Sequence, residues 1–128
     1  MLIAGPTYAA DPVPARANAP KELLEKRLEA ASKDFRQNVA CLKEVQALPS
    51  EVFGWLERRL DTELVQAQKP TARATAWRDH LERTQEIERV VAALAKAGQV
   101  RQAGADAATY YRLEAVIHLA KEGSGQLH

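Results

Sequence analysis

The chain has 128 residues, of which 46% are hydrophobic, 27% are charged and 5% are aromatic, with a formal net charge of +1 at pH 7. This length predicts a single domain, and the small net charge argues against the strongly basic surface typical of nucleic-acid-binding domains. A single cysteine, Cys41, excludes a disulfide within one chain. The hydrophobic residues are mostly alanine, leucine and valine, which favours thin packing of helix on helix over a thick core.

The first nineteen residues differ from the rest. Met1 to Ala10 form a short apolar stretch that ends in small residues before Asp11 and Pro12, and this pattern resembles a signal-peptidase site. The stretch is short and lacks basic residues ahead of it, so it fits either a truncated export signal or a coincidence. We expect a truncated signal and proline-containing tether over 1–19, in a periplasmic or secreted protein, with a cytoplasmic location left open. No segment approaches the roughly 20 apolar residues that a membrane helix needs.

The helical domain expected over 20–122 begins with Pro20 in a first helical turn, where its missing N–H costs nothing. Apolar residues then recur at steps of three and four, which predicts one face of a helix. They are Leu24, Leu28, Ala31, Phe35, Leu42 and Val45. Pro49 ends this helix, and Ser50 is the expected N-cap of the next one.

A second helical pattern runs from Phe53 to Leu94 and contains Pro70. Either one long helix bends at Pro70, or two helices meet at 68–71 with Thr71 as the cap of the second. The apolar phase continues through Pro70 without an offset, and no glycine accompanies the proline. This continuity favours one long, proline-kinked helix.

Gly98 is expected at the C′ position that ends this pattern, and a last helix is expected to begin near Ala105. Its apolar face would comprise Tyr110, Leu113, Ile117 and Ala120, and residues 123–128 would form a flexible tail. The fold class is therefore all-α. We expect an elongated antiparallel helical hairpin or bundle of three to four helices, with one long central helix.

One segment of the chain occurs twice. Residues 59–67 and 112–120, at an offset of 53 positions, share arginine, leucine, acid, aliphatic and alanine at matched places. Amphipathic helices of biased composition also match by chance. If the repeat is real, it predicts helix, short turn and helix twice over, with equivalent turns at 45–50 and 98–104. These two turns are where we expect a partner to dock.

A family resemblance begins at the second turn. The run Ala97 to Val100, followed by Asp106 to Ala115, resembles the helix-turn-helix repeat of the TolC-like outer-membrane efflux family. With Trp55 to Leu60 included, the chain looks closer still to small exported helical proteins of planctomycete type. The likeness covers about residues 27–122 and implies coiled-coil hairpins in an exported protein with no assigned activity. The chain lacks an alternating strand pattern, so the strand-forming part of that family is not implied.

Catalytic and cofactor-binding motifs are missing from the sequence. His80, His118 and His128 form no metal-ligand spacing, and no glycine-rich phosphate loop is present. A cross-helix site of Glu114, His118 and His80 is conceivable, but zinc sites want three or four converging ligands. We therefore predict a non-enzymatic protein with no catalytic, cofactor-binding or metal residues. The alternative is a periplasmic helical sensor or binding protein for a metal or small ligand.

Aromatic residues are the candidates for binding a partner. They are Phe53, Trp55, Trp77, Tyr110 and Tyr111. Four of them follow the two turns, where they either close the ends of the bundle or contact a partner. Trp77 is expected to be exposed on the long helix, as a self-association patch. The predicted function is an exported helical scaffold or protein-interaction module, whose partner is another protein or a second copy in a homodimer.

Overall fold

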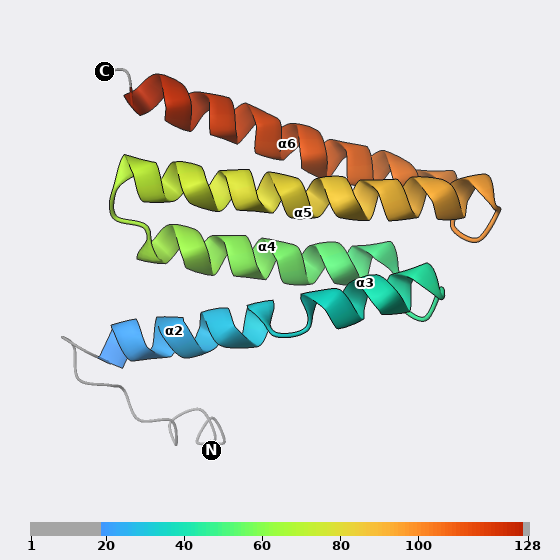
Figure 1. The fold of residues 1–128 in the computed structure, drawn as a ribbon, viewed down its shortest axis with the longest axis horizontal. Helices are drawn as coiled ribbons and strands as arrows, with labels where there is room; N and C mark the ends of the chain where they lie inside the picture. The colour runs from blue at the N-terminus through green and yellow to red at the C-terminus, as the bar shows by residue number, and fades with distance from the viewer. Residues whose placement is uncertain (1–18, 127–128) are drawn as a thin grey trace, which may run out of the picture.

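The computed structural model describes residues 19–126, which form helices and no strand (Figure 1). The helices are α2 (Ala19–Ser32), α3 (Phe35–Lys43), α4 (Pro49–Gln66), α5 (Pro70–Lys96) and α6 (Gln102–Gln126). α2 and α3 run in one direction, α4 returns, α5 reverses again and α6 returns once more. The predicted all-α, antiparallel bundle is confirmed. None of the described helices is long and apolar enough to cross a membrane.

The ends of the chain leave part of the prediction untested. The signal-like segment expected over 1–19 lies outside the described residues, except for Ala19, and so do residues 127 and 128 of the expected tail. The last helix is longer than predicted at both ends. α6 begins at Gln102 and continues to Gln126, past the point at 121–125 where the sequence was expected to end it.

α4 and α5 are separate helices, so the single bent helix is wrong and the alternative of two helices is the observed one. Lys69 is extended, with φ −106° and ψ 149°, and Pro70 is the first residue of α5. A residue before proline is pushed into the extended region, and proline is well tolerated at a first helical position. Lys69 is therefore the N-cap in place of Thr71. The chain reverses at this point, and α5 packs against α4.

The first predicted helix is also divided. α2 ends at Ser32, whose hydroxyl donates a hydrogen bond to the Leu28 carbonyl at 2.6 Å. Such a back-bond often bends a helix. Asp34 then precedes α3, in which Leu42 is buried as expected. Val45 does not continue the apolar face, because it lies in the turn after α3.

The turn between α3 and α4 and the turn between α5 and α6 are equivalent. α3 ends at Lys43 and α5 at Lys96, and α4 begins at Pro49 and α6 at Gln102. Both pairs of boundaries differ by the 53 positions of the sequence repeat. The repeat is therefore a repeat of helix boundaries as well as of residues.

Each turn begins with a left-handed residue just after the helix. Val45 has φ 57° and Gly98 has φ 75°. The Gly98 N–H donates to the Ala95 carbonyl at 3.0 Å and the Gln99 N–H to the Leu94 carbonyl at 2.8 Å. This pair of bonds is a Schellman C-cap, and the bonds from residues 45 and 46 to the carbonyls of 42 and 41 reproduce it. Gly98 occupies C′, as the sequence predicts.

The N-terminus of α4 is capped differently from the prediction. Leu48, not Ser50, is the N-cap, and Pro49 is the first helical residue. Glu51 compensates for the missing side-chain cap, because its carboxylate accepts a hydrogen bond from the Leu48 N–H at 2.8 Å. Pro49 again takes the position at which an N–H is not needed.

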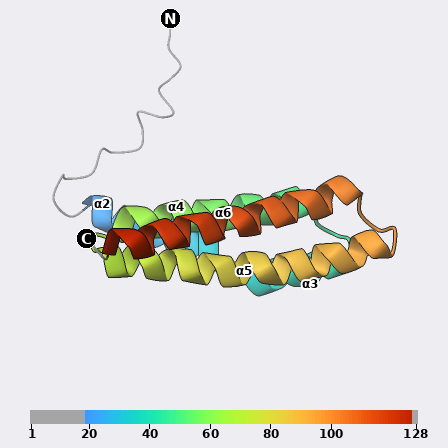
Figure 2. The ribbon, with the colours of Figure 1, turned by 90° about the horizontal axis from the view of Figure 1, so that it is seen from above.

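The core consists of two buried clusters along the bundle. The cluster near the turns comprises Val39, Leu42, Val52, Phe53, Leu56, Ile87, Val91 and Ala108. The second cluster comprises Leu60, Ala76, Trp77 and Ala115. Figures 1 and 2 show α6 running alongside α5 through much of the bundle, and this contact supplies Ala108 and Ala115 to the two clusters.

Candidate functional site

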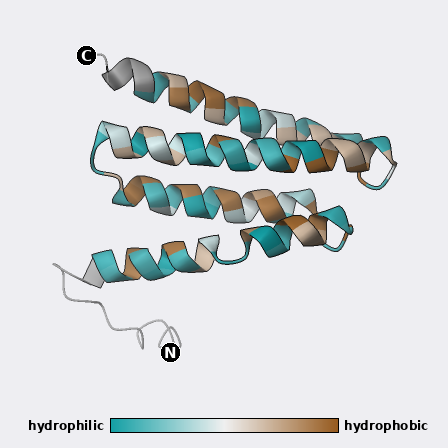
Figure 3. Cartoon of the chain, viewed as in Figure 1, coloured by the Kyte–Doolittle hydropathy of each residue, from teal (hydrophilic) through white to brown (hydrophobic). Residues whose placement is uncertain are grey.

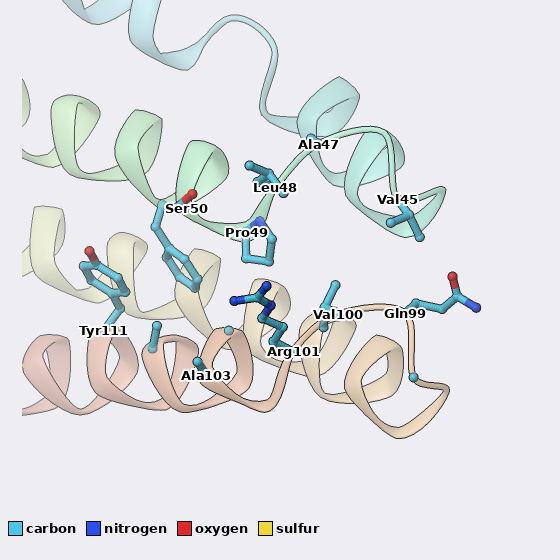
Figure 4. Close-up of a pocket in the computed structure, with 14 residues that line it drawn as sticks. Val45, Ala47, Leu48, Pro49, Ser50, Gln99, Val100, Arg101, Ala103 and Tyr111 are labelled. Carbon is cyan, nitrogen blue, oxygen red and sulfur yellow. The ribbon is translucent and has the colours of Figure 1, made fainter.

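The two equivalent turns border a cavity of about 760 Å³ at one end of the bundle (Figure 4). One wall is made by residues 45, 47–50 and 53, and the other by residues 98–101, 103, 104, 107 and 111. Gly104 lies next to Pro49 of the other wall, because a Cβ built on it would contact Pro49 Cγ at an ordinary van der Waals distance of 3.6 Å. Small-molecule sites commonly have volumes of about 300–1,000 Å³ and mostly apolar linings. The cavity meets both descriptions.

Two stacked aromatic rings form the inner part of the cavity. The Phe53 and Tyr111 centroids lie 4.5 Å apart with 17° between the ring planes, and Tyr110 meets Tyr111 edge-on at 5.6 Å. Burial raises the pKa of Tyr111, and the charges of Glu57 and Glu114 raise it further. The Tyr111 hydroxyl is therefore neutral at physiological pH and remains a hydrogen-bond donor.

Arg101 is the single charged residue among the described residues that line the cavity. In Figure 4 its side chain extends from the start of α6 toward Pro49. Some described arginines pair with carboxylates, as Arg112 does with Glu88 at 2.6 Å, whereas Arg27, Arg58, Arg78 and Arg89 do not. No ion pair of the described part of the chain includes Arg101. The cavity therefore has an apolar lining and one available cation.

The five aromatic candidates fall into three places. Phe53 and Tyr111 line the cavity, as expected for residues that follow the turns. Trp55 and Tyr110 are exposed, and the Arg58 guanidinium lies 4.7 Å from the centroid of the Trp55 ring. The structure thus brings together only two of the five at a concave site.

Trp77 is buried, so its expected place on the surface is wrong. Its side chain is 6% exposed, and its ring stacks on His118 at 4.2 Å with 4° between the planes. Because α4 and α5 are separate antiparallel helices, α5 is covered by both α4 and α6. One extended rod would have left this residue open, whereas here Leu60 and Ala115 pack against it.

The two histidines of the metal alternative both lie against Trp77. His80 meets that ring edge-on at 5.8 Å, and His118 stacks on it. His80 Nε2 lies 3.2 Å from Glu57 Oε2, at ion-pair distance but without hydrogen-bond alignment. Within the described residues, no group of three or more histidine, cysteine or acidic side chains could hold a metal ion. Both rings are accounted for by packing on Trp77.

Hydrophobic residues recur along α6 (brown in Figure 3), and their spacing and burial place them on two opposite faces of the helix. Its inner face contains the fully buried Ala108 and Ala115. The outer face exposes 62% of Tyr110, 45% of Leu113 and 53% of Ile117. The sequence pattern assigned this outer face to the core, and that assignment is wrong. The small alanines allow α6 to approach α5 closely, so the alanine face is buried and the larger side chains point outward.

Sequence reasoning found the two turns but missed Arg101, the residue that gives the cavity its charge. A signal for it was present, because Arg101 lies three residues after Gly98 and immediately before α6. Arg101 lines a cavity only because the turn at residues 45–50 lies opposite it, and the sequence pattern does not specify that arrangement.

A comparison of the chain with protein-family models, curated proteins and solved structures gives no match. The resemblance to TolC-like hairpins therefore stays a prediction.

Proposed function

We propose that this chain is a non-enzymatic helical scaffold that acts through protein–protein contact, with the outer face of α6 as its contact surface. That face comprises Tyr110, Leu113, Val116 and Ile117, each more than two-fifths exposed. A contiguous apolar patch of this kind typically marks an interaction site. Residues 110, 113 and 117 also have the i, i+3, i+7 spacing with which helices anchor in a partner. This exposed stripe is the observation that carries the proposal.

Charge placement favours a second copy of the chain as the partner. Asp106 and Lys121 are exposed and lie on the same side of α6 as the stripe, one toward each end. If two α6 helices pair antiparallel about an axis between residues 113 and 114, Asp106 of each copy lies opposite Lys121 of the other. The same pairing places Tyr110 opposite Ile117. A parallel pair would set like charges against each other, which is unfavourable.

The contact should be weak. Each of eight half-exposed side chains, four from each copy, would gain on the order of 1 kcal/mol on burial, because full burial of a large apolar side chain gives about 1.5–3 kcal/mol. Association costs at least about 4 kcal/mol in lost freedom. The balance is at most about 4 kcal/mol, which corresponds to a dissociation constant of about millimolar or weaker. The dimer should therefore appear only at high protein concentration.

Sedimentation equilibrium over micromolar to millimolar concentrations tests this proposal. We expect the average mass of the natural chain to rise with concentration, and Leu113→Glu to remain monomeric. Leu23→Glu is the matched control, because Leu23 is a half-exposed leucine on α2. Lys121→Asp should weaken association and the added change Asp106→Lys should restore it. A natural chain that stays monomeric at millimolar concentration, or a control as disruptive as Leu113→Glu, would contradict the proposal.

Export is the second part of the proposed function. It rests on the apolar stretch of residues 1–10 and the small residues before Asp11. The test is a fusion of residues 1–19 to a reporter enzyme that is active only outside the cytoplasm. Reporter activity above that of a fusion with a scrambled segment is the expected result, and equal activity would contradict export by this segment.

A further inference from the structure

The cavity between the two turns is lined by other residues than the outer face of α6, and the proposed scaffold function does not use it. We propose that this cavity binds an amphipathic carboxylate, a molecule with an apolar chain and one carboxylate such as a medium-chain fatty acid. Arg101 would hold the carboxylate, and the apolar walls would cover the chain. This inference stands independently of self-association through α6.

The walls suit an apolar chain. Leu48 is 64% exposed and Val45 is 45% exposed, so large apolar side chains of the cavity remain in contact with solvent. Phe53 and Tyr111 close the inner part with their stacked rings. Covering such surface with a ligand removes apolar area from water, which favours binding. In Figure 4 Leu48 and Pro49 lie across from the start of α6, leaving the cavity between them.

The charges suit an anion. Arg101 is the single charged group of the described lining, which contains no acidic side chain. A guanidinium matches a carboxylate with two parallel hydrogen bonds, and such charge-assisted bonds are roughly twice as strong as neutral ones. The hydroxyl of Ser50 is a further donor in the lining, whereas the Tyr111 hydroxyl in Figure 4 points away from Arg101. Arg101 would repel a cationic ligand, and a neutral ligand would gain no ion pair from it.

NMR titration of the 15N-labelled full-length chain with octanoate tests the proposal, with 1-octanol as the neutral analogue of equal chain length. Both probes are kept below the concentrations at which they aggregate. We expect saturable shifts confined to amides around residues 45–53 and 98–111. Octanoate should bind at least about tenfold more tightly than 1-octanol, because only octanoate engages the guanidinium.

Two variants separate the charge from the cavity. Arg101→Gln should weaken octanoate at least about tenfold and leave 1-octanol unchanged, since it removes the charge but keeps a side chain of similar length. Ala103→Trp should weaken both probes by filling the cavity. Arg78→Gln, at an exposed arginine outside the cavity lining, is the matched control and should bind both probes as the natural chain does.

Circular dichroism of each variant serves as the control for folding. Leu113→Glu should bind octanoate as the natural chain does, and this result would show that the cavity and the α6 contact are independent sites. Three results would overturn the proposal. They are the absence of saturable octanoate shifts, equal affinity for octanoate and 1-octanol, and octanoate binding that neither Arg101→Gln nor Ala103→Trp reduces.

Discussion

Val45 adopts a left-handed conformation, φ 57°, at the turn position where the equivalent residue of the second turn is Gly98. A left-handed backbone costs an L-residue about 1–2 kcal/mol, and branching at Cβ places valine at the upper end. Glycine removes this cost but gives the unfolded chain more freedom, which offsets about 0.4–1 kcal/mol. Val45→Gly also keeps the N–H that donates to the Leu42 carbonyl at 3.0 Å. We therefore expect Val45→Gly to be about 1 kcal/mol more stable than Val45→Ala, which loses the same half-buried side chain but keeps the left-handed cost.

Thermal and urea unfolding of the purified variants measure this difference. For a chain of this length, 1 kcal/mol corresponds to a rise in Tm of roughly 3–5 °C. The reciprocal variant Gly98→Ala should lose about 1 kcal/mol through the backbone alone, since a Cβ built there meets nothing within 4 Å. Val45→Ala is the control, because it trims the side chain and keeps the left-handed cost. A Val45→Gly variant less stable than Val45→Ala would refute the assignment of strain to this turn.

Three further predictions concern the core and the alkaline limit of stability. Trp77→Ala should cost about 3–5 kcal/mol by urea unfolding, because its ring is buried, whereas Trp55→Ala should cost less than about 1 kcal/mol; similar losses would contradict the burial of Trp77. The pKa of Tyr111 in the folded chain is raised above the unfolded value of about 10. The neutral Tyr111 side chain therefore contributes its full share to the free energy of unfolding below pH 10, and this contribution is lost as pH rises through the folded pKa. Tyr111→Phe should therefore flatten the loss of stability above pH 10 relative to the natural chain and to Tyr110→Phe, and an unchanged slope would argue against the shift. Ala115→Leu should cost about 1–3 kcal/mol by overpacking the contact between α5 and α6, and a neutral result would show that this contact is loose.

Local signals predicted the turns well. Glycine at a helix C′ position and proline at a first helical position have the same meaning wherever they occur, because they depend only on backbone sterics. Gly98 therefore marked the C′ position correctly, whereas Pro49 was expected to end the preceding helix and is instead the first residue of α4. The offset of 53 positions went further, since it also related the boundaries at Lys43 and Lys96.

The long-range features were harder to predict. An apolar phase that continues through Pro70 does not reveal that the chain reverses there, because two antiparallel helices can each keep the same periodicity. In α6, Leu113 and Ile117 gave a stronger hydrophobic signal than Ala108 and Ala115, although the alanine face is the buried one. Which face is covered depends on how closely two helices approach, and this is a property of both helices together.

Arg101 shows the same limit for the site. Its position within the predicted turn at 98–104 was visible in the sequence, but the cavity exists only because residues 45–50 lie opposite. Its availability depends in turn on the absence of an acidic neighbour among the described lining residues. A functional charge of this kind is defined by what surrounds it in space.

The most direct test of the central claim, antiparallel pairing of α6, is a mixed-disulfide experiment in a Cys41→Ser background. Tyr110→Cys and Ile117→Cys are prepared separately and oxidised at high protein concentration, alone and as an equimolar mixture. Antiparallel pairing predicts a disulfide-linked dimer mainly in the mixture, because residue 110 of one copy lies opposite residue 117 of the other. Equal cross-linking of each variant with itself would indicate parallel pairing, and no cross-linking above that of a Thr71→Cys control would show that α6 is not a contact surface.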